Sequence, residues 1–433
     1  MRQREIKRDF YLQQLIDHQD DGMIKIVTGV RRCGKSYLLF NLFYDHLLQS
    51  GVKPDEIITI ALDEERYADL RDVRVLAEYI RSRIKSKKKK YFLFVDEVQY
   101  AIKRSEFENE YDIGLYGVLN ELLHKSNVDV YVTGSNSKLL TKDVLTAFRG
   151  RGWEIRMHPL SFAEYFNHVG GDKRQAYADY SRYGGMPQVL ALRSELEKEE
   201  YLKGLFDEVY FKDVVSRYNL ELRPVFGEVV NVLCSSVGSL VNASKLARAI
   251  TSECNVKVSS ITVANYLEYL TESFLFSCVR RYDVKGKRYF SYPMKYFCED
   301  VGLRNARLNF RQQEPTHIME NVIYNELCRR GYSVDVGSVD VLEKKERGYT
   351  QKQAEIDFVV NRGSQRLYIQ SAYRVDDWEK QIQEIRPLLQ VGDVFRKIVI
   401  VEDVYHMWHS EEGVEFIGLY DFLLHPEIID SRP

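Results

Sequence analysis

The sequence predicts an α/β fold that begins with a doubly wound parallel sheet, and three observations lead to this prediction. Short apolar segments alternate with segments of helical periodicity over residues 1–158. A glycine-rich loop follows the first apolar segment and precedes a helical one, and a later apolar segment ends in two acidic residues. The strands expected from this pattern are residues 23–27, 56–61, 91–95, 128–133 and 153–157.

The loop of residues 29–36 matches the phosphate-loop pattern G-x-x-x-x-G-K-[ST] at every fixed position. Two glycines let successive backbone N–H groups face an anion, while Lys35 reaches the outer phosphates and the Ser36 hydroxyl ligates a metal. The pattern predicts a bound purine triphosphate with Mg²⁺. Cys33 is interpreted as a small filler, with an oxidisable thiol as the alternative. The expected nucleotide-binding residues are Gly29, Val30, Arg31, Arg32, Cys33, Gly34, Lys35, Ser36 and Tyr37.

The third apolar segment ends in Asp96 and Glu97, which is a Walker B pattern. Asp96 is expected to hold the Mg²⁺ through its water shell, and Glu97 to orient and activate the attacking water. The alternative is that the two acids only mark the point where a strand reaches solvent. The continuous apolar run before them, typical of a buried parallel strand, favours the functional interpretation.

Two further sets of residues are candidates for acting on the terminal phosphate. Ser135 and Asn136 follow the fourth strand, and they lie beside the phosphate loop if that strand pairs between the first and the third. A capped turn leading into a helix from residue 137 is the alternative. Arg151, just before the fifth strand, could reach a neighbouring subunit's site, or could be a turn arginine that contacts carbonyls.

Composition limits the classes of protein that fit. A chain of 433 residues exceeds one core, so two to four domains are expected. The formal charge of −2 excludes a global positive field, and the lysine-rich residues 85–90 are interpreted as a solvated loop. No apolar run approaches the roughly 20 residues that span a membrane, the N-terminus lacks the apolar core of a secretion signal, and six cysteines show no disulfide or metal spacing. A cytoplasmic protein without membrane contact is expected.

Two segments after the sheet read differently from it. Residues 159–233 have helical periodicity and are interpreted as a helical lid on the nucleotide domain. Residues 234–312 order two helices before a hairpin, as a winged helix does. Within 236–310 there are 11 Lys and Arg against 6 Asp and Glu, so this part carries +5 and the rest −7. The asymmetry favours DNA contact through Lys285, Lys287 and Arg288, with a pure protein-contact role as the alternative.

Residues 313–433 predict a small α/β domain. An acid on a helix, an acid on a strand and an acid-x-lysine on the next strand would form a metal-dependent phosphodiesterase site. Glu320 or Glu326 and Asp357 can fill the first two places, but the third place, residues 370–372, reads Gln-Ser-Ala. The lysine that would handle the attacking water is absent, so the domain is predicted to be catalytically inactive. His406 and His409 have weak metal spacing and are interpreted as surface residues.

The whole chain resembles a widespread group of bacterial and archaeal AAA+ ATPases that carry a restriction-endonuclease-like C-terminal domain of unknown function. The matching segments are residues 29–36, 95–99, 133–135, 159–164, 183–187, 295–305 and 355–358. The resemblance implies ATP hydrolysis, a ring-like or other homo-oligomer, a winged-helix domain and a C-terminal domain that often lacks the nuclease lysine. Gln370 and Ala372 look ordinary for this group.

The resulting hypothesis is a Mg-ATP-dependent ATPase that transmits its nucleotide state to a nucleic-acid or protein partner through its C-terminal half. Its expected catalytic residues are Lys35, Asp96, Glu97, Ser135, Asn136 and Arg151, with Ser36 and Asp96 as metal ligands. One alternative is a slow nucleotide-gated switch, or a DNA-binding module, in signalling or defence. A second is an active metal-dependent nuclease.

Overall fold

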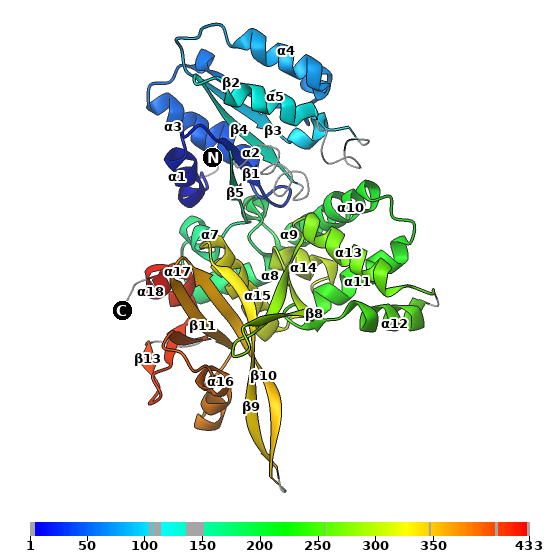
Figure 1. The fold of residues 1–433 in the computed structure, drawn as a ribbon, viewed down its shortest axis with the longest axis vertical. Helices are drawn as coiled ribbons and strands as arrows, with labels where there is room; N and C mark the ends of the chain where they lie inside the picture. The colour runs from blue at the N-terminus through cyan, green and yellow to red at the C-terminus, as the bar shows by residue number, and fades with distance from the viewer. Residues whose placement is uncertain are drawn as a thin grey trace. The chain divides into compact units, whose positions relative to one another are not determined.

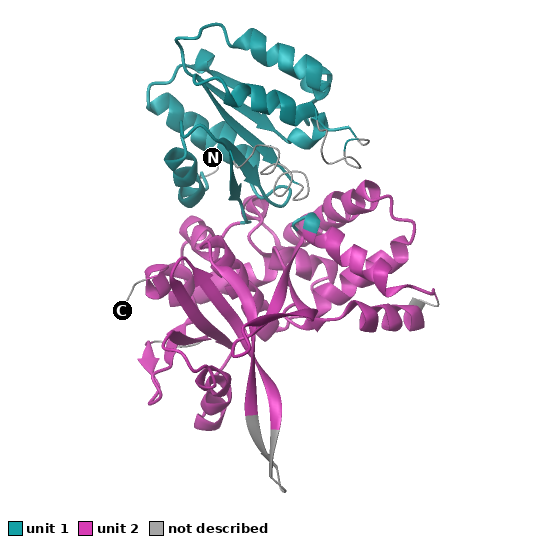
Figure 2. Ribbon diagram, in the orientation of Figure 1, with its two compact units in different colours: residues 1–159, 272–274 teal, residues 160–271, 275–433 magenta. Residues whose placement is uncertain are grey.

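The computed structural model describes residues 5–103, 106, 114–135, 151–254, 256–345, 348–402 and 406–430. The chain folds as two compact units (Figure 2). The first comprises Met1–Pro159 with Glu272–Phe274, and the second comprises Leu160–Thr271 with Leu275–Pro433. Apart from Pro159 and Glu272–Phe274, the predicted parts 159–233, 234–312 and 313–433 lie in one compact unit, and their division into a lid and two domains stays a prediction.

The first unit is built on a sheet of five strands in the order β2-β3-β4-β1-β5 (Figure 1). All its pairings are parallel, which confirms the predicted parallel sheet. β4 pairs with both β1 and β3, as the expectation for Ser135 required. The strands are β1 Ile24–Thr28, β2 Ile57–Ala61, β3 Tyr91–Asp96, β4 Val128–Gly134 and β5 Gly152–Arg156.

Helices connect these strands and cover the sheet. Every residue of β1, β3 and β4 is buried, so the apolar runs seen in the sequence are strands covered on both faces. α4 is started by Asp72, whose carboxylate accepts the N–H groups of Arg74 and Val75. The helical segments are α1 Asp9–Asp17, α2 Lys35–Tyr37, η1 Leu38–Phe43, α3 Tyr44–Gln49, η2 Pro54–Glu56, η3 Glu65–Arg71, α4 Val73–Arg83, η4 Val98–Ala101 and α5 Gly114–Leu123.

The second unit opens with helices, as the sequence predicted for residues 159–233. Asn305 fastens α8 to α14, because its side-chain amide donates to the carbonyls of Ser181 and Arg182 at 2.9 Å each. A Cβ at Gly302 would lie 2.1 Å from the Tyr183 carbonyl oxygen, so only glycine permits this close approach. The helices are α7 Phe162–Val169, α8 Lys173–Tyr183, η7 Pro187–Ala191, α9 Glu195–Gly204, η8 Leu205–Phe211, α10 Lys212–Arg217, α11 Arg223–Ser235 and α14 Val301–Arg307.

The predicted hairpin and the predicted C-terminal strands share one sheet of nine strands, ordered β13-β14-β12-β11-β10-β9-β7-β8-β6. The link is a parallel pairing of β7 with β9 at Arg281↔Val336 to Asp283↔Ser338. The predicted strand positions are confirmed, although several strands are longer. They are β6 Leu240–Val241, β7 Phe276–Asp283, β8 Arg288–Cys298, β9 Ser333–Lys345, β10 Gly348–Arg362, β11 Gln365–Ala372, β12 Arg396–Val401, β13 Trp408–His409 and β14 Glu415–Gly418.

The remaining helices accompany this sheet. α12 and α13 precede the β7–β8 hairpin, in the order that the winged-helix interpretation requires, and α15 lies between β8 and β9 in the chain (Figure 1). Among the described residues, no helix combines the length and apolar character needed to cross a membrane. These helices are α12 Ala243–Cys254, α13 Ser260–Glu272, α15 Pro315–Arg329, α16 Trp378–Leu389, α17 Leu419–Leu424 and α18 Glu427–Asp430.

Candidate nucleotide-binding site

The predicted phosphate loop runs from the end of β1 to the start of α2. Gly29 has φ +141° and Gly34 has φ +106°, a backbone region that side chains rarely adopt. A Cβ at Gly29 would lie 2.1 Å from the carbonyl oxygen of Met157, so a side chain there would displace the loop. The two fixed glycines of the sequence pattern thus have separate conformational reasons, and the loop leads directly into a helix N-terminus.

Lys35 is buried, and its ammonium is directed back at the loop. Nζ donates to the carbonyl oxygens of Gly29 at 3.0 Å and of Val30 at 3.1 Å. At this position against the loop backbone a cation can meet phosphate oxygens. Cys33 is fully buried, with its thiol 3.4 Å from the Met157 carbonyl oxygen, which fits the small-filler interpretation.

Asp96, the last residue of β3, is 3% exposed. Burial raises the pKa of its carboxyl to about 6, although the Ser36 and Thr133 hydroxyls donate to it and lower the pKa in part. The carboxylate therefore contacts the hydroxyl that the phosphate-loop pattern assigns to the metal. A buried acid with a raised pKa next to that hydroxyl is short of positive charge, which a divalent cation can supply.

Glu97 is held in place by three groups. The backbone of Glu97 has φ +52°, in the left-handed region, and the Glu97 N–H donates to Thr133 Oγ1 at 2.9 Å. The Ser135 hydroxyl lies 2.9 Å from both carboxylate oxygens, and the Gln99 side-chain amide donates to Oε2. The strained backbone and these contacts fix the direction of the carboxylate beside Asp96.

The structure therefore brings Ser135 to Glu97, whereas Asn136 lies outside the described residues. Sequence reasoning did not single out Thr133 or Gln99, although both contact the acidic pair. Thr133 could have been found, since it lies two residues before Ser135 on the same strand face. Arg151 is exposed next to β5, and its carbonyl accepts the N–H of Ile24 at 2.9 Å.

The lysine-rich segment and the two histidines lie at the surface, as interpreted from the sequence. Residues 85–90 form the connection between α4 and β3, where Lys89 pairs with Asp55 at 3.1 Å and Lys90 with Asp20 at 2.7 Å. His406 and His409 are exposed. No group of three or more potential metal-ligating His, Cys, Asp or Glu side chains suited to a metal occurs among the described residues.

The predicted basic contact surface lies at the turn between β7 and β8. Lys285, Lys287 and Arg288 are exposed there, and Arg288 also pairs with Asp283 at 3.4 Å. Tyr289 and Tyr292 of β8 are each 55% exposed. Exposed aromatic and basic side chains are thus gathered on one hairpin.

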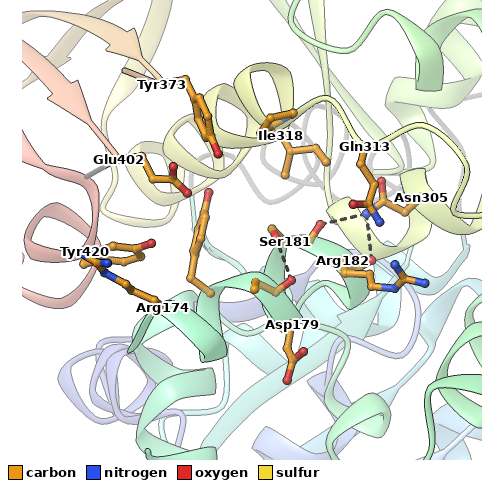
Figure 3. A pocket seen from close by; sticks show the side chains of 13 residues that line it. Arg174, Asp179, Ser181, Arg182, Asn305, Gln313, Ile318, Tyr373, Glu402 and Tyr420 are labelled. Carbon is orange, nitrogen blue, oxygen red and sulfur yellow. Dashed lines mark hydrogen bonds between the residues drawn. The ribbon is translucent and has the colours of Figure 1, made fainter. Parts of the chain in front are cut away.

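The second unit also contains a hollow of about 530 Å³, lined mainly by α8 and also by residues of α14, α15 and α17 and by residues that follow β11 and β12 (Figure 3). The side-chain amide of Asn305 is engaged there with backbone carbonyls of α8. The buried Tyr177 hydroxyl has no hydrogen-bond partner within the described part of the chain. Arginine and carboxylate side chains balance in its lining, so the hollow does not define the charge of a ligand.

Two carboxylates of the predicted nuclease site meet in the second unit. Glu320 of α15 and Asp357 of β10 both contact the ammonium of Lys295, at 2.8 Å and 3.8 Å. Glu326, the alternative to Glu320, instead pairs with Arg329 and Arg330 at 2.6 Å each. Of the two glutamates that the sequence left open, Glu320 is the one that shares a partner with Asp357.

Together with the strand order, the loop makes the first unit an AAA-type P-loop domain, and a family model described as an AAA domain matches residues 21–166. A model described as a domain of unknown function (DUF8612) matches residues 174–314. An uncharacterized protein of Haemophilus influenzae is 33% identical over 424 residues, covering 97% of this chain and 98% of that protein. The chain belongs to the same family as this Haemophilus influenzae protein.

Further likenesses are more distant. Uncharacterized protein MJ1544 of Methanocaldococcus jannaschii is 27% identical over 420 residues, covering 92% of this chain and 85% of that protein. Among solved structures, the Walker-type ATPase PABY2304 of Pyrococcus abyssi is 15% identical, with a TM-score of 0.49, covering 71% of this chain and 97% of that one. The endonuclease-like character of the C-terminal part stays a prediction.

Proposed function

We propose that the protein is a Mg-ATP-dependent ATPase that works in the cytoplasm as a homo-oligomer and couples nucleotide turnover to a partner. One observation carries the proposal. Lys35 of a phosphate loop after β1 and the Asp96–Glu97 pair at the end of β3 converge, and the hydroxyls of Ser36, Thr133 and Ser135 contact the acidic pair. No other arrangement in the described residues combines an anion cradle with a metal-seeking acid and a positioned base.

The residues present fit Mg²⁺. Ser36 and Asp96 would hold it, because a buried carboxylate with a raised pKa beside a hydroxyl gains stability from a hard cation. When bound, Mg²⁺ neutralises charge on the phosphate oxygens. Lys35 exchanges its two loop carbonyl partners for phosphate oxygens, which it can do within the buried loop.

Glu97 accepts a proton from the attacking water, or orients that water, on the open side of the pair. Ser135 and Gln99 hold its carboxylate in a fixed direction. The Ser135 hydroxyl can respond to the terminal phosphate by donating its hydrogen bond to a phosphate oxygen in place of Glu97. The expected result for Glu97→Gln is retained ATP affinity with phosphate release reduced by about 10²- to 10⁴-fold. Unchanged release would show that Glu97 is not the base.

Arg151 is proposed to complete a neighbouring subunit's site. Its exposure and its place next to β5 support this role, because an exposed side chain can reach a neighbouring subunit. A mixture of Arg151→Ala with Glu97→Gln subunits tests it. In a head-to-tail assembly, about one quarter of the sites then combine an intact base with an intact arginine, so activity returns to about that fraction. Two variants that stay inactive when mixed contradict an arginine acting in trans.

The rival function is a slow nucleotide-gated switch. It is supported by the hydrogen bonds that already engage the Glu97 carboxylate, because a base held by Ser135 and Gln99 would activate water slowly. Turnover separates the two functions. Rates of roughly 10⁻⁴ to 10⁻² s⁻¹ are typical of unassisted switch GTPases, whereas rates above about 1 s⁻¹ favour a motor. The exposed basic and aromatic hairpin supports DNA as the partner, since such surfaces track phosphates and stack on bases.

A further inference from the structure

A buried lysine lies among three carboxylates in the second unit, outside the nucleotide site. Lys295 of β8 is 3% exposed. Its Nζ lies 2.8 Å from Glu320 Oε1, 2.6 Å from Glu355 Oε1 and 3.8 Å from Asp357 Oδ1. The three acids come from two other elements, α15 and β10, so the ammonium sits where separate parts of the fold converge. These four residues are called the Lys295 cluster below.

The ammonium occupies the space that a metal ion would need. Divalent cations bind carboxylate oxygens at about 2.0–2.6 Å, and one oxygen of Glu320 and one of Glu355 are already engaged by Nζ. The backbone closes another side, because a Cβ at Gly238 would lie 3.0 Å from Glu320 Oε2. A second cation at the same position would meet both this enclosure and the repulsion of a buried positive charge.

One further carboxylate oxygen of the Lys295 cluster is engaged by the backbone. Asp357 Oδ2 accepts the N–H of Ser371 at 2.8 Å. The Gln370 side-chain oxygen accepts the N–H of Asp357 at 3.4 Å, so this residue braces β10 and does not act as a ligand. The place where a nuclease would need an acid therefore carries a structural amide.

Charges within the cluster agree with a resident ammonium. Burial opposes a charge on Lys295, but Glu320, Asp357 and Glu355 together raise the pKa of its ammonium above the ordinary value. Burial and the neighbouring Glu320 raise the pKa of Asp357, which lowers the negative charge that one lysine has to balance.

We propose that Lys295 is the built-in cation of this carboxylate cluster. It excludes divalent metal ions, so this cluster supports no metal-dependent nucleic-acid cleavage, and it fastens β8 to α15 and β10. The sequence lacks the expected catalytic lysine on β11. The site instead contains a lysine on β8, and its ammonium takes the place of the metal ion and not that of the catalytic lysine.

The first experiment counts Mn²⁺ ions bound to the wild-type chain and to Asp357→Asn by electron paramagnetic resonance, without nucleotide. Both chains contain the same phosphate-loop site, so any difference reports on the Lys295 cluster. Equal counts are expected. If Asp357→Asn binds one Mn²⁺ fewer than the wild type, or abolishes a Mn²⁺-dependent plasmid cleavage that the wild type shows, the proposal is overturned.

The second experiment removes the ammonium. Lys295→Ala is expected to bind one Mn²⁺ more than the wild type, and its thermal midpoint is expected to rise with each increase in Mn²⁺ concentration. Lys295→Arg, which keeps a cation, and Lys295→Ala/Asp357→Asn, which loses a ligand, should bind no additional ion. A folded Lys295→Ala chain with the wild-type Mn²⁺ count overturns the proposal. If that variant does not fold in any buffer, the comparison of the folded wild-type and Asp357→Asn chains decides.

Discussion

Asp96→Asn should stabilise the first unit while it abolishes turnover. The wild-type carboxyl is buried and its pKa is raised from 3.8 to about 6. The folded chain therefore binds this proton more tightly than the unfolded chain, so the free energy of unfolding falls as the pH rises from about 3.8 to about 6 and stays lower above that. The difference corresponds to roughly 3 kcal/mol at neutral pH. The amide of the variant offers only one acceptor oxygen to the two hydroxyl donors, so the variant loses one hydrogen bond and about 1 kcal/mol of its gain in stability. A net gain of about 2 kcal/mol is expected.

Amide hydrogen exchange of β3 and β4 measures this effect without nucleotide or metal. At pH 7.5 the Asp96→Asn chain should exchange about 30-fold more slowly than the wild type, and at pH 5 the advantage should shrink by about 1 kcal/mol. Asp129→Asn is the matched control. Asp129 is also 3% exposed, but it already accepts the ammonium of the buried Lys25, so its neutralisation should destabilise the unit by about 3–5 kcal/mol. Equal effects of the two variants, or a gain for Asp96→Asn that does not depend on pH, would refute the reasoning.

Two further predictions concern the loop and the hairpin. Gly29→Ala should abolish ATP binding measured by calorimetry, because the added Cβ would lie 2.1 Å from the carbonyl oxygen of Met157. The control is Gly51→Ala, since Gly51 also has a positive φ, +92°, but has nothing within 4 Å of an added Cβ; this variant should keep its ATP affinity within about twofold. Similar affinities of the two variants would contradict the prediction. Neutralising Lys285 and Lys287 should weaken duplex DNA binding and reduce its dependence on log salt by about 2, whereas neutralising Lys87–Lys88 should change neither. A duplex that does not bind even at low salt would reject DNA as the partner.

The fold of the first unit was largely predictable because its signals are local. A buried parallel strand appears in the sequence as a continuous apolar run, and all fixed positions of a phosphate loop fall within eight consecutive residues. The same reasoning placed Asp96 and Glu97 at the end of one strand. It did not single out Thr133 or Gln99, because a threonine at a strand end and a glutamine in a turn have many ordinary uses.

In the second unit the strands were predictable, but their partners were not. Each strand's apolar alternation is written in the sequence, whereas the pairing of β7 with β9 joins segments that are more than 50 residues apart. The prediction of Glu320 or Glu326 could not be narrowed from the sequence, since both lie on α15. The packing of that helix directs Glu320 to Lys295 and Glu326 to two arginines.

The sequence by itself determined which chemical groups this protein carries: a phosphate-loop pattern, an acidic pair after a buried strand, and a C-terminal half with Gln-Ser-Ala at residues 370–372. Tertiary structure alone decided which of these groups meet. The order of parallel strands placed β4 between β1 and β3 and so brought Thr133 and Ser135 to the acidic pair, and the folding of β8 onto α15 and β10 put Lys295 among three carboxylates. The physical reason is that the local residue pattern determines whether a segment forms a strand, a helix or a loop, whereas the packing of these segments against one another determines which charged groups become neighbours.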